Sequence, residues 1–144
     1  MKTLLSGVFL LISFALSGQD FKKIDEKDLD LKQKEFARKF ATDYFSRQIS
    51  GSSYQFRTDE ATDDIIKFLT PEKQKEVYNQ LKSAFGAYKS LDYSQAWLES
   101  NSNVRIYRFK SLFGDSNQME IRVVVNDKGK IAGFFIKPWA ETLQ

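Results

Sequence analysis

The chain has 144 residues, a formal net charge of +3, no cysteine and no histidine. The lack of cysteine excludes disulfides, thiolate metal sites and a lipid-modified cysteine, and the lack of histidine removes the commonest general base and metal ligand. A charge so close to neutral argues against nucleic acid or an anionic membrane as a partner. We therefore expect no metal, no cofactor and no nucleic-acid partner.

Residues 1–18 have the pattern of a secretory signal peptide. Lys2 is the only charged residue, 3–16 are mostly apolar, and small residues follow at Ser17 and Gly18. A bilayer-spanning helix needs roughly 20 apolar residues, so this stretch is short for a permanent anchor and is typical of a cleaved leader. We predict cleavage after Ser17 or Gly18 and export to the periplasm or the extracellular space. The mature protein would then be soluble, without a membrane anchor, and not a lipoprotein.

A charged leader is predicted over 19–30, followed by a single domain over 31–144. Three helices open this domain, and they are expected over about 31–49, 59–69 and 71–85. Asp30 and Thr58 are suitable N-caps for the first two helices. The pair Thr70–Pro71 predicts the start of the third, and Gly86 predicts its end.

The hydrophobic period then changes from 3.6 to 2, which indicates strands. Four are expected, over about 88–100, 104–113, 118–125 and 130–138. The links between them are short and rich in Asn, Asp, Ser and Gly, as in hairpins, and Gly129 can supply a positive φ. Helices followed by a four-stranded antiparallel meander predict an α+β fold.

Alternation along the strands assigns the two faces of this sheet. In the third strand the apolar face carries Met119, Ile121, Val123 and Val125, and the other face carries Glu120, Arg122 and Val124. In the last strand Ile131 and Phe135 are predicted to point one way and Phe134 the other. We expect one buried face and one partly solvent-exposed face. Aromatic residues on the solvent-exposed face would indicate oligomerisation or the binding of a partner.

The end of the chain carries the most specific pattern. After FGAYKSL (85–91) and three hairpin-linked strands it reads IRVVVNDKGKIAGFFIKPW (121–139): valines, an Asn/Asp-x-x-Gly turn, Ile-Ala-Gly, two aromatics and Lys-Pro. Over roughly 30–139 the chain resembles a bacterial family of secreted and fused modules, domain-of-unknown-function family 3887. That family is similar to the nuclear transport factor 2-like superfamily, in which helices pack into a curved sheet.

This resemblance implies a conical pocket between the helices and the concave sheet face. In the superfamily the pocket is enzymatic, binds a ligand only, or is filled by side chains, and fold alone does not decide between these. The candidate pocket-lining residues are Phe40, Tyr44, Phe85, Tyr107, Phe109 and Phe134. The candidate interface residues are Trp97, Arg105, Arg122, Phe135 and Trp139.

Acid–base catalysis would need a carboxylate and a tyrosine in the cone, because burial can bring a carboxyl pKa close to neutral. The candidates for it are Asp43, Tyr44, Tyr88, Asp92, Tyr107 and Glu120, and no motif brings any two together. The acids Asp59, Glu60, Asp63 and Asp64 do not have the spacing of a calcium loop. They suit the first turn of a helix better.

The sequence therefore predicts a non-catalytic exported module. It would bind a small apolar ligand in the cone or assemble through its sheet face, for example as a homodimer. The alternative is a small isomerase- or lyase-like enzyme.

Overall fold

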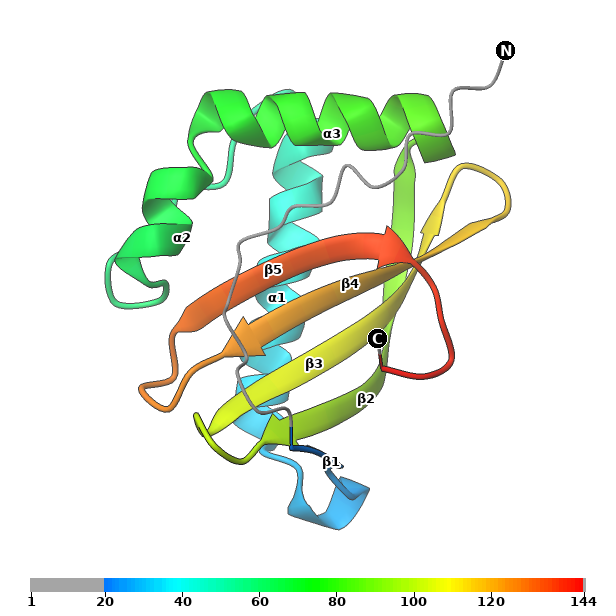
Figure 1. The fold of residues 1–144 in the computed structure, drawn as a ribbon. Helices are drawn as coiled ribbons and strands as arrows, with labels where there is room; N and C mark the ends of the chain where they lie inside the picture. Colours follow the sequence, from blue (N-terminus) through cyan, green and yellow to red (C-terminus); the bar gives the residue numbers. More distant parts are fainter. Residues whose placement is uncertain (1–19, 144) are drawn as a thin grey trace.

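The computed structural model describes residues 20–143, and the predicted signal peptide lies outside them. The α+β fold is confirmed, with three α-helices and one antiparallel sheet (Figure 1). The helices are α1 (Leu31–Ile49), α2 (Asp63–Phe68) and α3 (Pro71–Phe85). The strands are β1 (Phe21–Lys23), β2 (Tyr88–Glu99), β3 (Val104–Phe113), β4 (Asn117–Val125) and β5 (Ile131–Pro138). No helix in this part of the chain is long and apolar enough to span a bilayer.

The sheet has the order β1-β2-β3-β4-β5, so every strand pairs with its neighbour in sequence. Helix α1 lies against one face, and α3 crosses the end of the sheet (Figure 1). We call the opposite face of the sheet the outer face. Register shifts interrupt β2 twice and the β4–β5 pair once. Such bulges bend strands and increase their twist, which suits a sheet that curves around a long helix.

The predicted ends of α1 and α3 are confirmed by their caps. Asp30 Oδ1 accepts a hydrogen bond from Gln33 N at 2.9 Å, and Thr70 Oγ1 accepts one from Lys73 N at 3.2 Å. Gly86 ends α3 with a φ of +95°, in the left-handed region that favours glycine. These ends were predictable because each cap depends only on residues within one turn.

The sheet has five strands and not the four that were predicted, and the additional strand comes from the predicted leader. Residues Phe21–Lys23 form β1, the fifth strand, which pairs antiparallel with the end of β2. Ile24 N continues the pairing with a 2.9 Å bond to Ala96 O. Three residues are too few to show alternation in the sequence. The open edge of β2, with its unpaired backbone groups, decides their conformation.

The start predicted for the second helix is also wrong. Helix α2 begins at Asp63 and is capped by Thr62, not by Thr58. The residues before it run beside β5, because Ile131 N donates to Glu60 O at 2.8 Å and Thr62 N donates to Ile131 O at 3.0 Å. Pairing with a strand far away in sequence therefore displaces what would have been the first helical turn.

The face predicted for Ile131 is corrected by the β4–β5 bulge. Ile131 pairs with Val125 and belongs to the helix-side core, whereas Gly133 pairs with Val124 on the outer face. Downstream of the bulge the predicted alternation holds. Phe134 faces α1, and Phe135, opposite Arg122, faces outward.

Candidate functional site

The interior of the expected cone is filled by aromatic rings. Phe40 and Tyr44 from α1 both meet Phe134 from β5, with ring centroids 5.0 and 4.9 Å apart in edge-to-face geometry. All three side chains are buried within one core cluster. Edge-to-face contacts of this kind are the packing that buried aromatic rings prefer. These three candidate pocket residues therefore pack on one another.

The other three candidate pocket residues also belong to the packing of the core. Tyr107 and Phe109 of β3 are buried in the same cluster, and Phe85 at the end of α3 is half-buried against it. The Tyr107 hydroxyl donates to Gln33 Oε1 at 2.6 Å. None of the six candidate residues lines the two grooves described below.

Tyr44 is unusual because its hydroxyl is buried without a hydrogen-bond partner. Burial raises its pKa well above the ordinary value. A buried hydroxyl without a partner destabilises a fold, since it gives up its bonds to water and gains none.

Tyr44→Phe is therefore expected to stabilise the protein by about 1 kcal/mol and to raise Tm by about 3 °C. Urea and thermal unfolding of the two proteins would measure the difference. Tyr107→Phe is the matched control, because it removes a hydroxyl whose hydrogen bond is made, and it should lower stability. A loss of stability in both variants would contradict this account of Tyr44.

Among residues 20–143 no hydrogen bond joins a carboxylate proposed for acid–base catalysis to a tyrosine proposed for it. Asp43 pairs with Lys39 on the surface of α1, and Glu120 lies on the outer face of the sheet in an ion pair with Arg108. The tyrosine–carboxylate pair that does form joins Tyr54 Oη to Glu60 Oε1 at 3.1 Å. The same oxygen accepts from Arg57 N, so this contact fastens the loop before α2.

The acidic cluster around residues 59–64 is divided among local roles. Asp59 forms an ion pair with Arg57, with 2.6 Å between the charged atoms, while Glu60 holds the loop. Asp63 and Asp64 lie in the first turn of α2, where the helix dipole favours negative charge. Within residues 20–143 no cluster of acidic side chains is arranged to hold a metal ion.

The outer face of the sheet contains a buried ion-pair network. Arg108 and Arg122 are directly opposite each other on β3 and β4, and Glu120, two residues before Arg122 on β4, forms ion pairs with both. Glu120 Oε1 is 2.8 Å from Arg108 Nη2, and its Oε2 is 2.6 Å from Arg122 Nε. Burial alone would raise the pKa of Glu120, but the hydrogen bonds from both arginines outweigh it and hold the pKa below its ordinary value.

The C-terminal tail, residues 139–143, covers this network. Arg108 donates to the carbonyl oxygens of Ala140, Glu141 and Thr142, the last two at 3.4 and 3.5 Å. Its guanidinium carbon lies 4.6 Å from the centre of the Trp139 ring. The Arg108 side chain is consequently fully buried, and it binds the tail through main-chain atoms and one indole.

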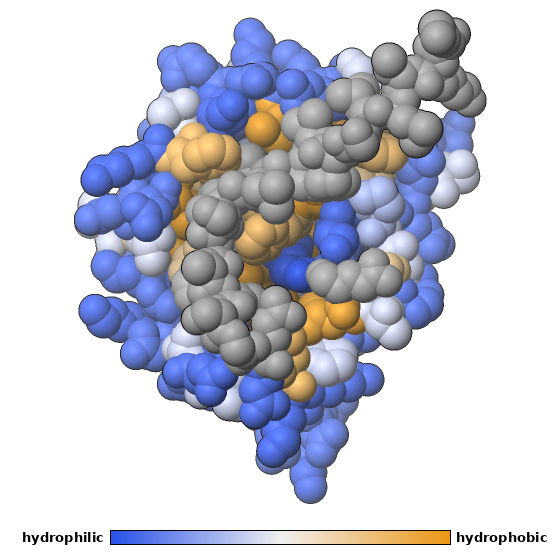
Figure 2. Space-filling view, in the orientation of Figure 1, coloured by the Kyte–Doolittle hydropathy of each residue, from blue (hydrophilic) through white to orange (hydrophobic). Residues whose placement is uncertain are grey.

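Beside the tail lies the Trp97 groove, a hollow of about 360 Å³ on the outer face. It is lined by Phe21, Lys23, Gln95, Trp97, Glu141, Thr142 and Leu143. Trp97 is half-buried there and packs against a second apolar cluster formed by Val104, Ile106 and Val124. Where it is visible, the middle of this face has both apolar and polar side chains, and the rim is mostly polar (Figure 2).

Four of the five candidate interface residues lie on or beside the outer face. Trp97 and Phe135 pack on the second apolar cluster, Arg122 bonds to Glu120, and Trp139 starts the tail. Arg105 is different, because it lies opposite Val125, which belongs to the helix-side core.

The residue that sequence reasoning missed here is Arg108. Arg108 occupies an outer-face position of β3, opposite Arg122, and the tail covers it there. Arg108 and the tail are more than 30 residues apart in sequence, so no local pattern predicts their contact. Comparison of the chain with protein-family models, curated proteins and solved structures finds no match.

Proposed function

We propose that this chain is a non-catalytic interaction module whose outer sheet face binds an extended segment of a partner protein. One observation carries the proposal. The outer face already holds an irregular segment, the chain's own tail, through its main-chain carbonyls, and leaves the Trp97 groove open beside it. Aromatic rings fill the interior that a small ligand would need, so the sheet face is the better supported of the two predicted binding modes.

The contacts to the tail explain how such a face could recognise a partner. Arg108 bonds main-chain carbonyls, which every peptide has, and Trp139 adds one aromatic anchor. Carbonyl contacts provide affinity for an extended chain, while a side-chain pocket provides specificity. Trp97 would supply that pocket, since tryptophan is enriched among the residues that dominate binding energy.

The charges on this face favour an acidic partner. Lys23 lines the Trp97 groove, and Lys110 and Lys137 occupy outer-face positions on either side of Glu120. Glu120 is buried within its ion pairs, which leaves Glu141 as the acidic residue lining the groove. Two copies meeting through this face would bring like charges together. An acidic, partly apolar segment of another protein fits better than a homodimer.

The wider setting is proposed on the sequence pattern and the order of elements. Three helices followed by a curved antiparallel meander are consistent with the cone of the nuclear transport factor 2-like superfamily and with family 3887. The pattern of residues 1–18 supports export to the periplasm or beyond. The partner would then be another exported protein or an extracellular domain.

Photo-crosslinking in the native host tests the surface. With p-benzoylphenylalanine in place of Trp97, we expect one adduct whose added mass is that of a different protein, joined through an acidic segment. The matched control carries the same group in place of Phe68, an exposed aromatic residue on α2, and should give no such adduct. An adduct of twice the chain's mass would replace this proposal with a homodimer. No adduct, or equal adducts from both positions, would refute the outer face as the binding surface.

A further inference from the structure

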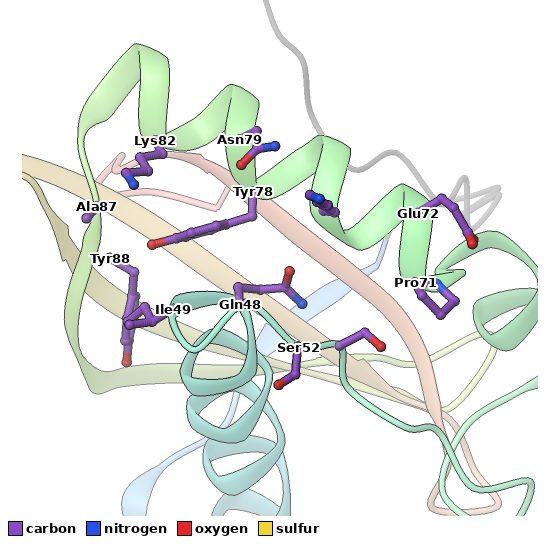
Figure 3. A pocket seen from close by; sticks show the side chains of 13 residues that line it. Gln48, Ile49, Ser52, Pro71, Glu72, Tyr78, Asn79, Lys82, Ala87 and Tyr88 are labelled. Atoms are coloured by element: carbon purple, nitrogen blue, oxygen red, sulfur yellow. The ribbon is translucent and has the colours of Figure 1, made fainter.

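A second groove, separate from the outer face, lies between the end of α1 and α3. It has a volume of about 550 Å³, within the usual range of small-molecule sites. We call it the α1–α3 groove (Figure 3). Its lining comes from the last turn of α1, the loop after it, one side of α3, and the first residue of β2 with the residue before it.

A buried glutamine network fixes one polar group of this groove. Gln74 is fully buried, and its Oε1 accepts from Tyr54 N at 2.8 Å and from Gln48 Nε2 at 2.9 Å. Its Nε2 donates to the carbonyls of Tyr54 and Leu69 at 3.1 and 2.9 Å. Each of these hydrogen bonds requires the observed positions of the amide oxygen and nitrogen, so flipping either side-chain amide would break hydrogen bonds.

The consequence is an unpartnered acceptor aimed at the groove. Gln48 is only 7% exposed and its Nε2 is used by Gln74, which leaves Gln48 Oε1 with no hydrogen-bond partner among residues 20–143. Figure 3 shows Gln48 and Tyr78 reaching into the space between the two helices. An amide oxygen at the groove surface, without a protein partner, can accept a hydrogen bond from a ligand that brings a hydroxyl or N–H donor.

The rim of the groove is positively charged, and its wall is apolar. Lys75 and Lys82 lie two turns apart on the same side of α3, and neither forms an ion pair with any residue from 20 to 143. Glu72 is the single acidic residue of the lining. Ile49 is 56% exposed at the groove, and Tyr88 is held in place by stacking on Phe45 at 4.6 Å.

From this arrangement we infer that the α1–α3 groove binds a small hydroxylated carboxylic acid of the size of a sugar acid. A ligand hydroxyl would donate to Gln48 Oε1, and the Tyr78 hydroxyl would serve a second polar group. The carboxylate would lie toward Lys82 and Lys75, and the carbon skeleton would rest on Ile49. Such a site combines a few fixed polar groups with an apolar wall, as small-molecule pockets do.

NMR titration of the full mature protein tests the inference. Glucuronate, galacturonate and gluconate are the probes, and glucose is the uncharged comparison. We expect saturable shifts confined to the Gln48 side-chain amide and the backbone of the groove residues, with at least one acid binding more tightly than glucose. Shifts elsewhere, no saturable shift with any acid, or equal binding of glucose would each overturn the inference.

Two lysine variants make the test specific. Lys82→Gln removes an exposed charge at the groove and should weaken binding of the acid up to about fivefold, the range expected for one partly solvated charge pair. Lys67→Gln removes an exposed lysine on α2 that does not line the groove, and should leave binding unchanged. Equal effects of the two variants, or no effect of Lys82→Gln, would refute a role for the groove lysines.

Discussion

Arg108→Met is expected to lower the free energy of unfolding by about 3–5 kcal/mol, the usual loss when one partner of a buried ion pair is removed. Glu120 would remain buried and keep its ion pair with Arg122 but lose the one with Arg108, and the carbonyls of the tail would lose their donor. Urea unfolding measures the change. Arg105→Met is the matched control, because Arg105 is half-buried on the same strand and forms no ion pair within residues 20–143. It should cost less than about 1 kcal/mol.

The same variant should release the tail. Trp139 lies over the Arg108 guanidinium, so its fluorescence should shift toward the red in a Trp97→Phe background as the indole becomes solvated. Equal losses of stability from the two arginine variants, or an unchanged Trp139 spectrum, would contradict the role of Arg108 in holding the tail.

The pH dependence of stability gives a further check. The folded pKa of Glu120 is lowered, so its contribution is present above the unfolded carboxyl pKa and is lost as pH falls through the folded one.

Gly86→Ala is expected to destabilise the protein by about 3 kcal/mol or more, the sum of a left-handed backbone penalty and a steric overlap. The φ of Gly86 is +95°, and a Cβ there would lie 2.5 Å from Gly114 Cα and 2.8 Å from Gly114 N. Those atoms belong to the turn between β3 and β4, whose Gly114 N bonds Ala87 O at 2.8 Å. The backbones would have to separate where α3 joins the sheet.

Gly51→Ala is the matched control for Gly86. Gly51 also has a positive φ, +78°, but an added Cβ would meet nothing within 4 Å. It should cost about 1 kcal/mol, the left-handed penalty alone. Thermal and urea unfolding of both variants would separate the two contributions. Similar losses would show that the close approach of Gly86 to Gly114 adds nothing.

Helix starts and turns that depend only on neighbouring residues were predictable from the sequence. Asp30 and the Thr70–Pro71 pair act within one helical turn, and Gly129, with a φ of +77°, closes the last hairpin as expected. The strand faces were mostly predictable too, since alternation is a property of the strand itself. The exception is Ile131, because a bulge changes the register there and the hydrophobic pattern of the strand does not reveal the bulge.

The candidate sites were less predictable, because each depends on residues far apart in sequence. The aromatic residues of the cone were foreseen as a set, but whether they line a pocket or fill it depends on the distance from α1 to β5. No pattern in the sequence predicts the α1–α3 groove. Gln48 and Gln74 are 26 residues apart, and neither is unusual in a helix.

By itself the sequence determined the order of the three helices and the four strands after them, the caps that start α1 and α3, and the apolar sides of β4 and of β5 beyond its bulge. Tertiary structure alone decided that Phe21–Lys23 would join the sheet, that α2 would start late, and that Arg108 would be buried. The physical reason is common to all three. Unpaired backbone groups at a strand edge, and charges on a sheet face, must find partners when they lose water. Those partners come from parts of the chain that only folding brings near.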